Sequence, residues 1–186
     1  MGFPLAQAAA RRAVQFYNGN PLISNSVSGI GLFFTGDLLA QKLDPDQKGD
    51  GRFDLTRAAK MGALGILLNG AGLHTWYKFV ERVFPGKSST SIVNKILLEQ
   101  LLWAPPVLTT TLAYVSLVAK NETAGHAAGN VSDKFSTAYV ADWKVWPATN
   151  VITYYLIPIN FRPLFVGGVQ CFFQAYMSLL GHESEK

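Results

Sequence analysis

Ionisable residues interrupt the long apolar stretches of this sequence, among them Asp37, His74, Glu99 and Arg162. Ionisable side chains are costly in the hydrocarbon of a bilayer, so they usually face a water-filled cavity, pair with one another or bind a solute. We therefore expect Asp37, Glu99 and Arg162 to line or gate a polar cavity between helices. His74 would add a group that titrates near neutral pH.

The spacing of the charged residues also suggests partners. Asp37 lies deep in an apolar segment and needs a partner or water, and we expect Arg162 to be that partner. Lys95 and Glu99 are four residues apart on one helix face and are expected to pair with each other. Lys60 lies near the end of a segment, where its amine can extend to the membrane surface. A purely structural role for Lys60, Lys95 and Glu99 is therefore an alternative to a role in the cavity.

The sequence shows no pattern typical of an enzyme. Serine and histidine occur, but without a nucleophile elbow. The GKSS stretch at 86–89 lacks the earlier glycine of a phosphate-binding loop, because Glu81 occupies that position. Cys171 is the single cysteine, and no His/Cys cluster has zinc-ligand spacing. We predict no catalytic residue, no bound metal and no cofactor.

The composition predicts a membrane protein. Of the 186 residues, 49% are hydrophobic and 15% are charged, whereas about 25% of the residues in a typical soluble domain are charged. The net charge of +4 comes from scattered basic residues that form no patch. We therefore expect the bilayer and small solutes as partners, and no direct binding of nucleic acid.

The apolar segments predict an all-α integral membrane bundle with four spans. Each segment is long enough to cross a hydrocarbon core of about 30 Å. Glycine, alanine and serine recur within the segments, which suits close contact between membrane helices and would also suit a homo-oligomer. Polar loops such as residues 44–54 separate the four segments, which are 22–43, 55–84, 92–120 and 145–180.

The chain divides into two unequal parts at the sequence level. Residues 1–20 contain no acidic residue and carry the pair Arg11 and Arg12. We interpret this part as an amphipathic segment that leads into the first span. Residues 21–186 contain no linker or repeat and are expected to form a single membrane-embedded helical domain.

A helix with one apolar face is predicted immediately before the last apolar region. Charged residues on its other face keep it out of the bilayer centre, so it should lie at the membrane interface. Trp143 and Trp146 should then sit at headgroup level, and Pro147 would begin the last span. The apolar face consists of every fourth residue: Val131, Phe135, Tyr139 and Trp143.

The last apolar region is too long for one straight span. Val145–Leu180 contains a single charge, Arg162, and as one helix it would be much longer than a hydrocarbon core of about 30 Å. Pro158 and Pro163 bracket a natural break. We predict two helical pieces that meet near Asn160–Pro163.

Four blocks, in order along the chain, resemble one family of small organellar membrane proteins. They are YNGNPLISNSVSGIGLFFTGDLLAQ at 17–41, DLTRAAKMGALGILLNGAGLHTWYKFVERVFP at 54–85, KILLEQLLWAP at 95–105 and WKVWPATNVITYYLIPINFRP at 143–163. The last block is similar to a tryptophan-proline and proline-arginine signature. The family is that of the peroxisomal membrane protein and the mitochondrial inner-membrane protein Mpv-seventeen. The chain departs from it at Glu99, Asn150 and Thr153–Tyr154, where the family usually has Asp, Gln and Asn-Phe.

The resemblance implies a function that the residues alone do not. It implies a four-span channel or transporter for small metabolites in the mitochondrial inner membrane, with the peroxisomal membrane as the alternative location. Mitochondrial members are linked to nucleotide supply, mitochondrial DNA maintenance and stress tolerance. A different class of function also stays open, namely a scaffold or organelle-sorting protein that transports nothing.

Overall fold

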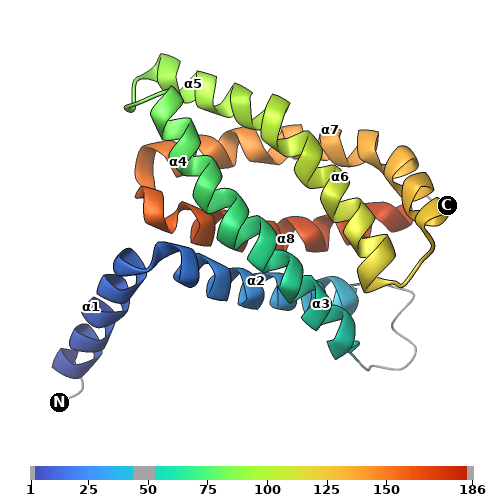
Figure 1. Cartoon of the computed structure of the whole chain (residues 1–186), viewed down its shortest axis with the longest axis horizontal. Helices are drawn as coiled ribbons and strands as arrows, with labels where there is room; N and C mark the ends of the chain where they lie inside the picture. The colour runs from blue at the N-terminus through green and yellow to red at the C-terminus, as the bar shows by residue number, and fades with distance from the viewer. Residues whose placement is uncertain (1–2, 44–52, 184–186) are drawn as a thin grey trace.

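A computed structural model describes residues 3–43 and 53–183, so most of the predicted 44–54 loop lies outside the described residues. Every regular element within these two ranges is helical, which confirms the all-α class (Figure 1). The helices are α1 (Phe3–Gly19), α2 (Pro21–Leu43), α3 (Leu55–Gly65), α4 (His74–Val83), α5 (Ser89–Leu98), α6 (Ala104–Tyr114), α7 (Ala124–Leu156) and α8 (Arg162–Glu183).

Short π-helical segments join several of these helices into longer rods. The segment η2 (Ile66–Leu73) links α3 to α4, η3 (Glu99–Trp103) links α5 to α6, and η4 (Val115–Ala119) extends α6. Pro105 follows η3 in the first turn of α6, where a missing backbone N–H is tolerated best. The two prolines at 105–106 therefore do not interrupt the rod Ser89–Ala119.

The rods run back and forth between two ends of the bundle (Figure 1). At one end α1 joins α2, α4 turns into α5 and α7 turns into α8; we call it the α1 end. At the opposite end α3 begins and η4 leads into α7. The helix α1 projects away from the bundle, in contrast to the other helices.

Glycines allow α2 and the rod α3–η2 to cross at backbone contact. A Cβ atom on Gly29 would collide with the carbonyl oxygen of Gly65, and a Cβ atom on Gly65 would collide with that of Gly29. Farther along the same crossing, a Cβ atom on Gly70 would overlap the side chain of Ser26. Membrane helices that pack through small residues approach each other in this way.

The burial pattern is the reverse of that in a soluble bundle. Large apolar side chains point outward, for example Val27 (63% exposed) and Leu101 (64% exposed), whereas Asn25, Gln100 and Lys95 are almost fully buried. Contiguous exposed apolar surface of this kind marks contact with lipid or another protein. By length and hydropathy, two rods among the described residues qualify as membrane spans: Pro21–Leu43 and Ser89–Ala119.

The region before the last apolar stretch differs from the prediction. The sequence predicted a separate interfacial helix and a span that begins at Pro147, but α7 runs without interruption from Ala124 to Leu156. Pro147 lies inside α7, because a single lost backbone hydrogen bond can be tolerated when the helix packs against neighbours. The break predicted near Asn160–Pro163 is present: α7 ends at Leu156, a 3-10 turn η5 (Ile159–Phe161) follows, and α8 begins at Arg162.

The two tryptophans of this region lie in different environments, which corrects a second expectation. Trp143 is 39% exposed, whereas Trp146 is 9% exposed and packs edge-on against Phe173 of α8. With 3.6 residues per turn, the two side chains are rotated by about 60° around α7, and Trp146 lies on the side that meets α8. Trp146 is therefore a wall of the bundle interior.

Candidate functional site

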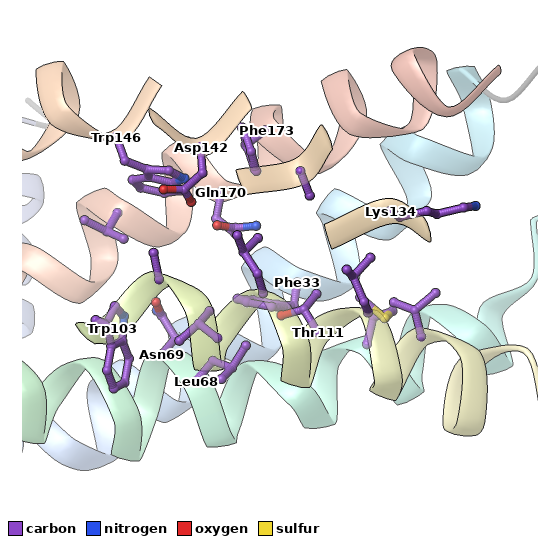
Figure 2. A pocket seen from close by; sticks show the side chains of 18 of the residues that line it. Phe33, Leu68, Asn69, Trp103, Thr111, Lys134, Asp142, Trp146, Gln170 and Phe173 are labelled. Atoms are coloured by element: carbon purple, nitrogen blue, oxygen red, sulfur yellow. The ribbon is translucent and has the colours of Figure 1, made fainter. Parts of the chain in front are cut away.

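A cavity of about 880 Å³ lies inside the bundle. Its lining residues come from α2, the α3–α4 rod, the α5–α6 rod, α7 and α8. Lys120, Asp133 and Lys134 line it near the opposite end and are exposed, whereas Trp146 and Asn150 line it deeper and are buried. The cavity thus has an exposed part and a buried part, and Figure 2 shows side chains from several helices reaching into it.

The buried part of the cavity contains polar atoms without a protein partner. Asn69 Nδ2 and Asn150 Oδ1 are buried and make no hydrogen bond of standard geometry. A buried polar group without a partner is destabilising unless water or a ligand satisfies it. Donors and acceptors are both present, so this part of the cavity can bind a polar guest.

A second carboxylate lies close to these groups. Asp142 is buried in α7, and its Oδ2 accepts a hydrogen bond of 2.9 Å from Nε2 of Gln100. The backbone carbonyl of Gln100 accepts a bond of 2.8 Å from the hydroxyl of Tyr139. In Figure 2, Asp142 and Gln170 extend from their helices toward the side of the cavity that carries Asn69. The amide of Gln100 therefore fixes the position of a carboxylate on the cavity wall.

Sequence reasoning missed this part of the site. Asp142, Gln100 and Asn69 were not among the residues predicted to line a cavity. The available signal was the placement of amide side chains within long apolar segments, since uncharged polar groups also need partners in a bilayer. Because the amide side chains are uncharged, a search for ionisable residues did not find them.

Asp37 lies at the wall of the cavity, but its partner is not the predicted one. Nη2 of Arg57 lies 3.1 Å from its Oδ1, and Nε2 of Gln41 donates a bond of 2.7 Å to its Oδ2. Gln41 also exchanges hydrogen bonds with the backbone of Asp54, the residue that caps α3. We call Asp37 and Arg57 the Asp37 pair. The pairing with Arg162 was wrong because α2 and α8 both start at the α1 end and run in parallel (Figure 1). Arg162 begins α8 at that end, whereas Asp37 lies near the far end of α2.

Arg162 instead joins a buried cluster at the α1 end. Its Nη1 lies 2.6 Å from Oε1 of Glu81, and Nζ of Lys95 lies 2.9 Å from Oε2 of the same carboxylate. Lys95 also donates a bond of 2.9 Å to the carbonyl of Gly86. We call Glu81, Lys95 and Arg162 the Glu81 cluster. The predicted pair of Lys95 with Glu99 was wrong, because helical side chains lean toward the N-terminus and Lys95 reaches back to Gly86.

Aromatic rings separate the Glu81 cluster from the cavity. The guanidinium of Arg162 lies 4.9 Å from the ring centre of Tyr154, and Nζ of Lys95 lies 5.2 Å from the same centre. The carboxylate of Glu99 faces the hydroxyls of Tyr77 and Tyr154 on the cavity side. Cation–π contact stabilises desolvated cations of this kind. Glu99 thus belongs to the cavity and also lies beside the cluster.

The remaining predicted residues lie elsewhere. Neither His74 nor Arg162 is among the residues that line the cavity, so the four predicted residues do not share one site. His74 is half-buried at the start of α4. Pro158 precedes η5, and Pro163 is buried in the first turn of α8. Lys60 donates a bond of 2.9 Å to Oδ1 of Asn121 at the opposite end.

Comparison with known proteins places the chain in a family. The profile of the Mpv17 / PMP22 family matches residues 116–178. Protein SYM1 of Gibberella zeae is 30% identical over 172 residues, which cover 89% of this chain and 95% of that protein. The chain belongs to the Mpv17 / PMP22 family. The resemblance inferred from the four sequence blocks is therefore confirmed.

Other members of the family are similar over most of their length. The mitochondrial inner membrane protein Mpv17 of Xenopus laevis is 29% identical over 150 residues, covering 80% of this chain and 83% of that protein. Peroxisomal membrane protein 2 of Bos taurus is 26% identical over 181 residues, covering 96% and 92%. Family members are thus found in two organellar membranes. No solved structure matches the chain.

Proposed function

We propose that this Mpv17 / PMP22 family member is an organellar membrane channel or transporter for small polar metabolites. The observation that carries this proposal is the cavity of about 880 Å³ with its buried, partnerless polar atoms. A protein that only fixed its helices in register would have no need for a hollow of this size lined by carboxylates and amides. The exposed outer face of the bundle is apolar, which suits a lipid environment.

The membrane arrangement is part of the proposal. Four spans are proposed: α2, the α3–α4 rod, the α5–α6 rod, and the broken last region made by α7 and α8. The rods Pro21–Leu43 and Ser89–Ala119 support the first and third by length and hydropathy. Relatives named for the mitochondrial inner membrane and for peroxisomes support an organellar location. We propose the mitochondrial inner membrane, with the peroxisomal membrane as the alternative.

The solute would enter from the opposite end. Near the opposite end, the lining of the cavity carries both signs of charge, with Asp37 and Asp133 beside Arg57 and Lys134. The buried part carries Glu99 and Asp142 without a lysine or arginine among the lining residues that lie there. At the α1 end, the Glu81 cluster and its tyrosines lie between the cavity and the surface. Passage of a solute would require these rings to move.

Solute flux in reconstituted vesicles tests the proposal. The purified full-length chain would be incorporated into liposomes, and the flux of a neutral sugar would be compared with that of a monovalent cation of similar size. Glu99→Gln and Asp142→Asn should each change the ratio of the two fluxes by about fivefold. That change corresponds to an interaction of about 1 kcal/mol between a carboxylate and a unit charge at roughly 4 Å in water.

His74→Gln is the matched control, because His74 is half-buried on α4 and does not line the cavity. It should leave both fluxes unchanged. If Glu99→Gln and Asp142→Asn fold normally and also leave both fluxes unchanged, the cavity is not the route. Absence of flux from the wild-type chain, together with capture of a membrane partner, would favour the scaffold function instead.

A further inference from the structure

The two ends of the bundle differ sharply in charge. Among the described residues, Glu81 is the one acidic residue at the α1 end that is not buried, and Lys95 and Arg162 already neutralise it. At the opposite end, the acidic residues Asp37, Asp54, Glu122 and Asp133 mix with lysines and arginines. Five exposed basic residues remain at the α1 end: Arg11, Arg12, Lys78, Arg82 and Lys87.

The helix α1 belongs to this basic end. The ring of Tyr17 stacks on that of Phe161 in the α7–α8 turn, with ring centres 4.7 Å apart. Nδ2 of Asn160 donates a bond of 3.1 Å to Oδ1 of Asn18. These contacts fix the last turn of α1, while Figure 1 shows the rest of the helix leaving the bundle. The position of α1 is therefore set by the same turn that carries Arg162.

The residues of α1 suit a membrane surface. Gln7, Arg11, Gln15 and Asn18 follow one another at helical spacing and form a polar face. Phe16 is 59% exposed on the other side of the helix. No acidic residue occurs before Asp37. A helix with an apolar face and basic residues on its polar side lies in the plane of an interface.

We propose that the α1 end binds the headgroups of anionic phospholipids, with α1 lying along the surface of the bilayer. The charge there is positive and exposed, which is complementary to phosphate-bearing headgroups and would repel basic partners. The adjoining helix α2 is one of the two rods suited to cross the membrane, so it holds α1 at the depth of the headgroups. The opposite end, with its mixed charges, has no comparable preference.

Counting of bound lipid tests this proposal. The full-length chain would be extracted from vesicles of phosphatidylcholine and phosphatidylglycerol, and native mass spectrometry would count the lipids that remain bound. The variant Arg12→Gln/Lys78→Gln/Arg82→Gln should lose phosphatidylglycerol enrichment by about fivefold for each charge removed. The matched variant Lys42→Gln/Lys120→Gln/Lys134→Gln removes the same charge from the opposite end and should keep the enrichment. Equal losses in the two variants would overturn the proposal.

Three further measurements keep the test decisive if a triple variant folds poorly. Enrichment by the wild-type chain should fall with added salt, because exposed charges are screened; salt-independent enrichment would contradict the proposal. Displacement of the bound lipid by soluble glycerol phosphate alone would show a site for a free anion, which also overturns it. A spin label at position 16 (Phe16→Cys with Cys171→Ser) should collide with oxygen more than with a water-soluble nickel chelate, and the reverse would place α1 in water.

Discussion

The Asp37 pair and the Glu81 cluster are both ion pairs between helices, but they bury different members: the carboxylate side chain is 7% exposed in the Asp37 pair and 25% exposed in the Glu81 cluster. The side chains of Lys95 and Arg162 are 0% and 4% exposed, and one carboxylate serves both. The side chain of Arg57 is 18% exposed, and Asp37 has this one cation as its partner together with Gln41. Asp37 and Arg57 line the cavity, whereas no member of the Glu81 cluster does.

This difference separates a structural role from a functional one. Removal of the single carboxylate from the Glu81 cluster would leave two buried cations without a counter-ion, which a low-dielectric interior does not tolerate. Removal of a charge from the Asp37 pair leaves a partly exposed arginine that water can still reach. A substitution in the Glu81 cluster should therefore lower the stability of the protein, and a substitution in the Asp37 pair should change the passage of solutes.

The largest effect is expected from Glu81→Gln. Two buried cations would lose their shared carboxylate, and stability should fall by roughly 3–5 kcal/mol. Thermal unfolding in detergent, followed by circular dichroism, measures the change. Asp133→Asn is the matched control, because it removes a carboxylate from an exposed position and should change stability by less than about 0.5 kcal/mol.

A triple replacement tests whether the loss in Glu81→Gln comes from the two buried cations left without a counter-ion. Glu81→Leu/Lys95→Met/Arg162→Met removes all three charges and should recover most of the stability that Glu81→Gln loses, since apolar replacements of buried ion pairs are often neutral. If Glu81→Gln were as stable as the wild-type chain, the cluster would be well hydrated and the comparison between the two regions would fail.

An intermediate effect is expected at the glycine crossing that holds the Asp37 pair together. Gly65→Ala places a Cβ atom against the carbonyl oxygen of Gly29 and should destabilise the protein by roughly 1–3 kcal/mol. Gly31→Ala is the matched control on α2, because its Cβ atom would meet nothing within 4 Å. That variant should be neutral or stabilising by up to about 1 kcal/mol, as alanine is the better helix former. Equal losses of stability in Gly65→Ala and Gly31→Ala would mean that the helices are not tightly packed at this crossing.

The sequence predicted the fold better than the site. Hydropathy and segment length identify the rods, and two prolines predict the break after Leu156, because both signals are local. The partners of Asp37, Lys95 and Arg162 depend on which helices are neighbours, and no local pattern contains that information. Pro147 misled the prediction, since its effect on α7 depends on packing around it.

The smallest change in stability is expected from Asp37→Asn. This variant tests directly whether the Asp37 pair differs in role from the Glu81 cluster. The amide keeps the shape of the side chain and can still contact Gln41, so stability should fall by about 1 kcal/mol or less. Flux through reconstituted vesicles should nevertheless change, because Asp37 lines the cavity. Thermal unfolding and the ratio of cation to sugar flux would be measured on the same preparation. A stability loss as large as that of Glu81→Gln, with the flux ratio unchanged, would assign Asp37 the same structural role as the Glu81 cluster.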